Sequence, residues 1–338
     1  MESSVSVVYV ESNHMSQRKR TVIDILRESP GFVSGEVISA RLGISRNAVH
    51  KHVKSLRKRG YQILGISRRG YKLEAEPVKL VVPVITEMTQ GSMFGRSFRY
   101  YDEIESTNVE AKELAMAGAP EGTVVIAELQ RAGRGRLGRR WTSPAGKGLL
   151  FSVILRPTLP MSRAHMLTIV AAVAAARGIE AQTDAAVRIK WPNDLFVGDR
   201  KAGGILLEVA GEQDVVEWVI VGIGINVNTE YAELPVDLRR TATSLKMATG
   251  DPVDRSELLA RILLALETAY KEAQKHGFDR ALSEFRQRDY LLKRSVSVQT
   301  REGSVIGEAT GIDNQGALLV QLPHRHVRRF HSGDVTLH

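Results

Sequence analysis

The chain has 338 residues, 43% hydrophobic and 25% charged, which allows two or three domains and argues against a disordered, fibrous or coiled-coil protein. The net charge of +9 favours a polyanionic partner such as nucleic acid. The absence of cysteine excludes disulfides, thiolate metal sites and cysteine nucleophiles, and it suits the reducing cytoplasm. No apolar run approaches the roughly 18 residues of a membrane span, so we expect a cytoplasmic protein with no membrane partner.

The positive charge is concentrated near the N-terminus. Residues 16–76 contain fourteen Lys and Arg against five Asp and Glu, an excess that equals the net charge of the whole chain. The remaining residues are therefore balanced. We expect residues 1–17 to form a flexible tail, and we expect any polyanion to bind the domain that follows at residues 18–76.

Residues 18–76 have the element order of a winged helix-turn-helix domain. The pattern is helix, helix, turn, helix, and then two short strands around a tight turn. Ser34 and Ser45 stand where they can cap the second and third helices, and Gly43 ends the second helix. The third helix is expected to run to about Arg59.

The third helix has an apolar and a basic face. Val49, Val53 and Leu56 repeat at helical spacing and should face the core. The opposite face and the tip of the wing supply the candidate DNA-binding residues, which are Arg46, Asn47, His50, Lys51, Lys54, Arg68 and Arg69. Such a face suits phosphate and base-edge contacts in a major groove. A solvated helix face is the alternative, but the whole charge excess lies on this one domain.

A larger domain is expected at residues 97–290, after a linker and entry segment at 77–96. Its predicted strands are 98–104, 123–129, 149–155, 187–191, 195–197, 205–209 and 215–227, and its predicted helices are 107–116, 163–176, 256–276 and 279–289. Thr107 and Glu110 have capping-box spacing for the first helix. Close turns between strands predict a multidomain α+β protein whose sheet is mainly antiparallel or mixed, not a Rossmann fold. Short strands and glycine turns predict a small SH3-like β-barrel at 291–338.

The segment from Arg131 to Trp141 is rich in glycine and arginine. Glycine lets backbone amides converge on an anion, and arginine matches the geometry of phosphate and carboxylate groups. We expect a loop that is disordered until an anion binds. Neither the Walker A nor the dinucleotide-binding pattern is present. A solvated or RNA-binding loop is the alternative.

A second polar segment begins at a predicted strand. Strand alternation places Val187, Ile189 and Trp191 on one face and Arg188 and Lys190 on the other. A lysine that projects from a sheet into a pocket can serve as a fixed cation for a carboxylate or a phosphate. The alternative for such a residue is an exposed strand lysine.

Together these segments resemble the biotin protein ligase family. The motifs that match in order and approximate spacing are Ser106-Thr107-Asn108, Gln130 with Gly133 to Arg139, Lys190-Trp191-Pro192-Asn193-Asp194, Arg200 to Leu206, Gly222 to Asn226, Gly311-Ile312-Asp313 with Gly316-Ala317-Leu318, and Ser332 to Val335. The resemblance extends from Thr21 to Leu337. The DNA-binding domain points to the bifunctional ligase-repressor type of this family.

The resemblance implies an ATP-dependent ligase. The carboxylate of biotin attacks the α-phosphorus of ATP to give biotinyl-5′-AMP, and a lysine of a biotin carboxyl carrier protein then takes the biotinyl group. Lys190, Arg136 and Arg134 are the implied catalytic residues, and Lys190 bridges the biotin carboxylate and the α-phosphate. Mg²⁺ is expected to assist through the phosphates of ATP, with Asp194 as the candidate ligand.

The resemblance also implies a set of ligand contacts and a mode of regulation. The implied biotin- and adenylate-binding residues are Ser106, Thr107, Asn108, Gln130, Gly133, Arg134, Gly135, Arg136, Lys190, Gly204, Gly222, Gly224 and Asn226. The glycines on the strands are expected to let the backbone approach the ligand. A homodimer that forms with biotinyl-AMP bound would repress transcription at operator DNA. A lipoate-type protein ligase and a non-catalytic biotin-sensing repressor are the alternatives.

Overall fold

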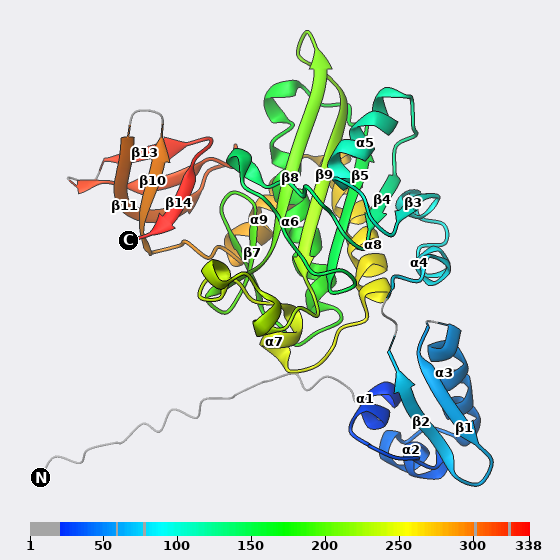
Figure 1. The fold of residues 1–338 in the computed structure, drawn as a ribbon. Helices are drawn as coiled ribbons and strands as arrows, with labels where there is room; N and C mark the ends of the chain where they lie inside the picture. The colour runs from blue at the N-terminus through cyan, green and yellow to red at the C-terminus, as the bar shows by residue number, and fades with distance from the viewer. Residues whose placement is uncertain (1–20, 59, 77–78, 301–302, 324–325) are drawn as a thin grey trace, which may run out of the picture.

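The computed structural model describes residues 21–58, 60–76, 79–300, 303–323 and 326–338. The expected tail at 1–17, the expected helix end at Arg59 and the first two residues of the expected linker lie outside the described residues. The chain contains an N-terminal helix-turn-helix unit, a central α+β unit and a C-terminal β-rich unit (Figure 1).

The N-terminal unit has the predicted winged-helix order. It contains α1 Val22–Arg27, α2 Gly35–Leu42, α3 Arg46–Lys58, β1 Gln62–Ile66 and β2 Gly70–Ala75. Ser34 caps α2 by accepting a hydrogen bond from the amide of Val37 at 3.2 Å, and Ser45 accepts one from the amide of Ala48 at 3.2 Å. Gly43 ends α2 with a positive φ of 64°. The predicted caps and helix end are therefore confirmed.

One apolar core joins the three helices to the wing. The three α3 residues predicted to face the core, Val49, Val53 and Leu56, are all buried in it. The wing is an antiparallel pair, and Gly70 follows its turn with φ 101°. A Cβ at this position would lie 2.1 Å from the carbonyl oxygen of Val33. Glycine is required there because the wing packs closely on the segment before α2.

The central unit is built on a seven-stranded sheet of order β3-β4-β5-β9-β8-β7-β6. The strands are β3 Ser97–Tyr101, β4 Thr123–Ala127, β5 Gly148–Leu155, β6 Val187–Lys190, β7 Asp194–Val197, β8 Arg200–Glu212 and β9 Val215–Asn226. Only β3 and β4 pair in parallel, so the predicted mixed and mainly antiparallel sheet is confirmed. β8 is longer than the predicted 205–209 because its first residues pair with β7 while the rest pair with β9.

Helices cover both faces of this sheet (Figure 1). The helical elements are α4 Val82–Met88, η1 Met93–Gly95, α5 Thr107–Met116, η2 Arg136–Gly138, η3 Met161–Arg163, α6 Met166–Glu180, η4 Tyr231–Glu233, η5 Val236–Leu238, α7 Leu245–Thr249, α8 Arg255–His276 and α9 Asp279–Gln287. α6 and α8 pack on each other and on one face. α5 packs on the opposite face, where Ala111 and Ala115 meet Ile154 and Ile220.

Two helix starts differ from the predictions. The capping box proposed for Thr107 and Glu110 is wrong, because Ser106 is the N-cap residue and Thr107 is the first residue of α5. Thr107 instead hydrogen-bonds to Gln130, and Glu110 accepts a hydrogen bond from the Tyr101 hydroxyl at 2.7 Å. These tertiary contacts outcompete the local cap. The predicted helix 163–176 starts later, at the first residue of α6, because η3 precedes it.

The segment between the N-terminal and central units is anchored at the start of α8 and at Glu128, which follows β4 and pairs with Arg255, the first residue of α8. It contains α4, which packs against α8 and buries Ile85. The Leu80 amide donates to Glu128 Oε1 at 2.5 Å, and the Val81 amide donates to Ser256 Oγ at 2.9 Å. A third contact comes from the wing, where the Tyr61 hydroxyl donates to the carboxylate of Asp254 at 3.3 Å. We call these three hydrogen bonds the α8 junction.

The C-terminal unit is a five-stranded antiparallel sheet of order β13-β12-β11-β10-β14. Its strands are β10 Ser295–Thr300, β11 Gly303–Ile312, β12 Leu318–Gln321, β13 Val327–Phe330 and β14 Asp334–Leu337. This is the β-rich unit predicted for this end of the chain. Trp191 Nε1 donates to the carbonyl oxygen of Gly316 at 2.9 Å and links the unit to the central sheet. Among the described residues, no helix is both long and apolar enough to cross a bilayer.

Candidate functional site

A cavity of about 350 Å³ lies over one face of the central sheet. It brings together almost all of the residues predicted to bind biotin or adenylate, from segments far apart in the sequence. The predicted residues that line it are Ser106, Thr107, Asn108, Gln130, Arg134, Gly135, Arg136, Lys190, Gly204, Gly222, Gly224 and Asn226. Gly133 is the exception, since its Cβ position would lie 2.4 Å from the carbonyl oxygen of Trp141, inside the loop.

The floor of the cavity comes from β8 and β9. Gly204 pairs with Gly224, so these residues point to the same face of the sheet. A Cβ on Gly222 would lie 1.9 Å from Asn108 Oδ1, and one on Gly224 would lie 2.7 Å from Cε2 of Trp141. Glycine at 222 and 224 therefore makes room for side chains of the site itself, whereas the prediction was that it admits the ligand.

A polar cluster at the start of α5 borders the cavity through Thr107, Asn108 and Gln130. Asn108 Nδ2 donates to the carboxylate of Glu208 at 2.7 Å, and the Thr107 amide donates to Gln130 Oε1 at 2.7 Å. The Ser152 hydroxyl lies 2.8 Å from Thr107 Oγ1 and 2.7 Å from Asn108 Oδ1. Sequence reasoning missed Ser152 and Glu208. Their signal is a polar side chain among apolar neighbours, since Ser152 lies within the apolar strand β5 and Glu208 stands between Leu207 and Val209 in β8.

The glycine-arginine segment has a compact conformation, in contrast to the disordered loop that we expected. The Gly135 amide donates to the carbonyl oxygen of Arg139 at 2.7 Å, and the Trp141 amide donates to that of Gly133 at 2.9 Å. Leu137 at its tip has a positive φ of 55° and is 72% exposed. The segment thus forms a closed turn at the edge of the cavity.

Arginines of this turn reach the C-terminal unit. Arg136 donates to Asn193 Oδ1 at 3.1 Å and to the carbonyl oxygen of Gly333 at 3.3 Å, and Arg139 forms an ion pair with Asp334. Burial lowers the pKa of Arg136 from its ordinary value, and nearby carboxylates partly oppose that shift. The C-terminal unit is therefore part of the site, a contribution that the sequence motifs did not predict.

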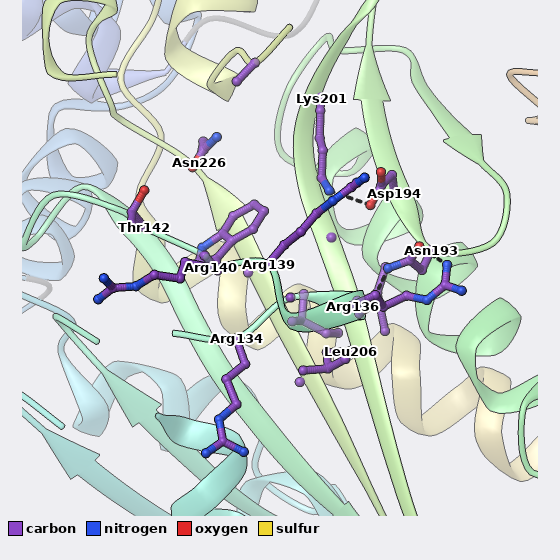
Figure 2. A pocket seen from close by; sticks show the side chains of 18 of the residues that line it. Arg134, Arg136, Arg139, Arg140, Thr142, Asn193, Asp194, Lys201, Leu206 and Asn226 are labelled. Carbon is purple, nitrogen blue, oxygen red and sulfur yellow. Dashed lines mark hydrogen bonds and ion pairs between the residues drawn. The ribbon is translucent and has the colours of Figure 1, made fainter. Parts of the chain in front are cut away.

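The arginines point in different directions. Figure 2 shows Arg136 and Arg139 extending toward Asn193 and Asp194. In the same view Arg134 and Arg140 point away from these two residues. Arg134 is exposed. The structure thus places Arg136 within the cavity cluster and turns Arg134 toward its outer rim.

Lys190 projects from β6 into the cavity. Ile189 is buried and does not line the cavity, as strand alternation predicted. Trp191, which follows the end of β6, is buried but lines the cavity beside Lys190, so the prediction that it lies on the opposite face is wrong. The Lys190 ammonium lies 5.7 Å from the centroid of the Phe196 ring. Burial lowers the pKa of Lys190 from its ordinary value, and the carboxylate of Asp194 partly opposes this effect. A half-buried cation in a concave site can hold an anionic ligand.

Asp194, the candidate metal ligand, forms an ion pair with Lys201 at 2.6 Å. Lys201 also lies 5.7 Å from the Trp141 ring, and both residues line the cavity. Within the described ranges, no group of three or more His, Cys, Asp or Glu side chains is arranged to hold a metal ion. The assignment of Asp194 as a metal ligand stays a prediction.

The predicted DNA-binding residues form an exposed basic face. All seven are exposed, and they lie on α3 and at the tip of the wing. Three of them contact neighbours: Arg46 pairs with Glu36 at 2.7 Å, His50 Nδ1 lies 3.2 Å from the Tyr71 hydroxyl oxygen, and the Arg69 guanidinium lies 4.6 Å from the centroid of the Phe32 ring. Their individual DNA contacts stay predictions.

A winged helix-turn-helix unit, joined to an α+β unit with a cation-lined cavity and a β-rich C-terminal unit, defines a DNA-binding protein with a ligand-binding body. Sequence comparison identifies the three parts. Residues 18–72 match a helix-turn-helix domain, residues 100–226 match the biotin/lipoate A/B protein ligase family, and residues 292–337 match the C-terminal domain of biotin protein ligases.

Relatives match the chain over most of its length. It is 39% identical to the bifunctional ligase/repressor BirA of Bacillus spizizenii over 95% of this chain and 99% of that protein. The Escherichia coli bifunctional ligase/repressor BirA is 33% identical over 86% of this chain and 88% of that protein. A structure of Aquifex aeolicus biotin protein ligase in complex with biotin and ATP aligns with a TM-score of 0.63 and 29% identity, covering 72% of this chain and 99% of that one. The chain belongs to the family of bifunctional biotin ligase/repressors.

Proposed function

We propose that this protein forms biotinyl-5′-AMP from biotin and ATP, transfers biotin to a lysine of a biotin carboxyl carrier protein, and represses transcription when the adenylate is bound. One observation carries the proposal. A single cavity holds the cations Lys190 and Arg136 beside the polar cluster of Thr107, Asn108 and Gln130. A polar head group and an adjacent anionic group of one ligand can therefore bind together.

In the first step, an oxygen of the biotin carboxylate forms a bond to the α-phosphorus, and pyrophosphate leaves with the electrons of the broken P–O bond. Lys190 bridges the carboxylate and the α-phosphate, which lowers their mutual repulsion and stabilises the charge that develops on phosphorus. Arg136 lies at the same cavity and supplies a second, planar donor group for phosphate oxygens. Neither residue forms a covalent bond to the ligand.

In the second step, the ε-amino group of the carrier lysine attacks the biotinyl carbonyl carbon. AMP leaves with the electrons of the C–O bond, and the nitrogen loses a proton as the amide forms. Lys190 and Arg136 remain beside the phosphate, where they stabilise the departing AMP. The turn from Gly133 to Trp141 shields the mixed anhydride from water before the carrier arrives.

Trp141 provides the fit for a nucleotide. Its Nε1 is buried and has no hydrogen-bond partner among the described residues, although Trp141 lines the cavity. An indole offers both a stacking face and a donor. Mg²⁺ is usually held by phosphate oxygens, waters and one or two carboxylates. Asp194 is the proposed protein ligand for Mg²⁺, and its carboxylate would contact both the metal and Lys201.

For repression, we propose that the exposed face of α3 enters a major groove and that the wing residues Arg68 and Arg69 meet the neighbouring backbone. Winged helices usually read paired half-sites, so the adenylate-bound protein is proposed to act as a homodimer on operator DNA.

The proposed domain limits are 18–76, 97–290 and 291–338. ATP, the carrier protein and the operator are all cytoplasmic, which is the compartment that we propose.

Incorporation of labelled ligand tests this function. The purified full-length chain, ATP, Mg²⁺ and a biotin carboxyl carrier protein are incubated with labelled biotin or labelled lipoate. We expect transfer of biotin only, and loss of pyrophosphate release in Lys190→Ala with its thermal unfolding unchanged. Transfer of lipoate would support the lipoate-type alternative. Biotin-dependent operator binding without any transfer would support the non-catalytic sensor.

A further inference from the structure

Four oxygen atoms form a chain through the polar cluster. Gln130 Oε1, Thr107 Oγ1, Ser152 Oγ and Asn108 Oδ1 follow one another at 3.0, 2.8 and 2.7 Å. Of these atoms, only the two hydroxyl oxygens carry a proton, so two protons serve three contacts. The hydrogen bonds that Gln130 and Asn108 make with other groups therefore determine the direction in which each hydroxyl donates.

Other groups of the protein determine which way the two end atoms of this row of oxygens are oriented. Gln130 Oε1 accepts a hydrogen bond from the Thr107 amide, which can only donate. At the other end, Asn108 Nδ2 faces the carboxylate of Glu208 at 2.7 Å and the carbonyl oxygen of Leu206 at 3.4 Å. A carboxylate and a carbonyl can only accept, so Asn108 must turn its Oδ1 toward Ser152.

This orientation decides the state of Thr107. The single proton of Ser152 goes to Asn108 Oδ1, and Ser152 cannot also donate to Thr107. The hydrogen bonds of the described residues include no other donor to Thr107 Oγ1. Thr107 lines the cavity and is only 4% exposed. Its oxygen is thus an acceptor, held away from solvent, that lacks a donor from the protein.

We propose that Glu208 is a positioning residue that makes the site select a ligand with an N–H group at Thr107. The inference rests on the proposed function, in which that ligand is biotin. The cyclic urea of biotin offers N–H donors, whereas the dithiolane ring of lipoate offers none. Glu208 does not line the cavity, and it acts only through the orientation of Asn108 and Ser152.

Replacement of the Glu208 carboxylate by an amide changes the direction of hydrogen-bond donation among Asn108, Ser152 and Thr107. In Glu208→Gln the new amide can donate to Asn108 Oδ1, which lets Asn108 turn its Nδ2 toward Ser152. Ser152 then donates to Thr107, and Thr107 donates to Gln130. Every oxygen contact now has a proton, so Thr107 receives its donor from the protein and gains less from a ligand N–H.

The test is a ratio of two affinities. Calorimetry measures Kd for biotin and for two analogues in which one or the other ureido N–H is replaced by oxygen, using the full-length chain. We expect the wild type to prefer biotin over at least one analogue by about tenfold or more, the effect of one buried unpaired acceptor. Glu208→Gln should reduce that preference by about fivefold. The matched control Glu212→Gln, exposed on the same strand, should leave it unchanged.

A second substitution separates proton direction from structural support. Ser152→Ala in the Glu208→Gln background removes the hydroxyl that donates to Thr107, so the preference for biotin should return. If Glu208 merely supports the fold, the affinities for biotin and analogue fall together, their ratio stays at the wild-type value, and the inference is overturned. If Glu208→Gln does not fold, Glu208→Ala, which also frees Asn108 to turn, gives the same two outcomes. A wild-type chain that binds no biotin would overturn the proposed function itself and this inference with it.

Discussion

The Arg136 guanidinium donates a hydrogen bond to the carbonyl oxygen of Gly333, a residue 197 positions further along the chain. Asp334, the next residue, pairs with Arg139 of the same turn. The C-terminal unit thus holds the glycine-arginine turn from outside while Asn193 holds it from the central sheet. The closed position of this turn therefore depends on contacts made by two of its arginine side chains.

Arg136→Gly should release biotinyl-5′-AMP into solution. The substitution removes the contacts to Asn193 and Gly333 and one cation that lines the cavity. Free adenylate should then biotinylate lysines of unrelated proteins, measured as label on serum albumin added to the reaction. Arg131→Gly is the control, because Arg131 is exposed and pairs with Glu103 outside the cavity. Retention of the intermediate by both variants would show that the turn does not seal the site.

Adenylation should fall at high pH earlier than an ordinary lysine predicts. Only the charged ammonium of Lys190 can bridge two anions, and burial lowers its pKa. The rate is therefore lost as pH rises through a value below about 10.4, the usual pKa of lysine. The pH profile of kcat/KM reports this group in the free enzyme. In Lys190→Arg the fall of kcat/KM on the alkaline side should occur at higher pH, since arginine stays charged. An identical limb in both proteins would assign it to another group.

Gly222→Ala should weaken biotin binding by about tenfold or more. The new Cβ would lie 1.9 Å from Asn108 Oδ1, so Asn108 must leave its position beside Ser152 and Glu208. Calorimetry with biotin alone checks this without any contribution from ATP. Gly31→Ala provides the comparison, because nothing lies within 4 Å of a Cβ there. Equal biotin affinity in the two variants would contradict the packing argument.

Salt should separate the two activities. Residues 16–76 hold a charge excess equal to the whole net charge of +9. If about six phosphates are contacted, operator affinity should fall roughly a thousandfold between about 50 and 200 mM salt. Adenylate formation in the central unit should change far less over that range. Filter binding and pyrophosphate release, measured on the same preparation, make the comparison. Parallel losses of both activities would place DNA and adenylate chemistry on a shared charged surface.

Much of the fold follows from local patterns. Three predictions depend only on neighbours in sequence and are confirmed: the α3 repeat of Val49, Val53 and Leu56, the caps at Ser34 and Ser45, and the alternation within β6 from Val187 to Lys190. The alternation ends with the strand, since Trp191 lines the cavity beside Lys190. The mixed sheet also follows, because close turns force adjacent strands to run antiparallel.

The remaining features depend on contacts between distant residues. Thr107 has the spacing of a capping residue, yet Gln130 and Ser152 take its side chain. Glu208 gives no motif of its own, and its role follows only from the position of Asn108 on the neighbouring helix. Gly333 meets the site because the C-terminal sheet packs against it. No periodicity within a single segment encodes these pairings.

The α8 junction connects the winged-helix unit, which carries α3, to the central unit. Tyr61 connects the wing directly to Asp254, while Leu80 and Val81 tie down the chain between the two units. If the junction holds in the proposed homodimer, the distance between the two α3 helices is set by the surface that joins the two central units. We therefore expect that an operator lengthened by half a helical turn is not bound by both winged helices at once.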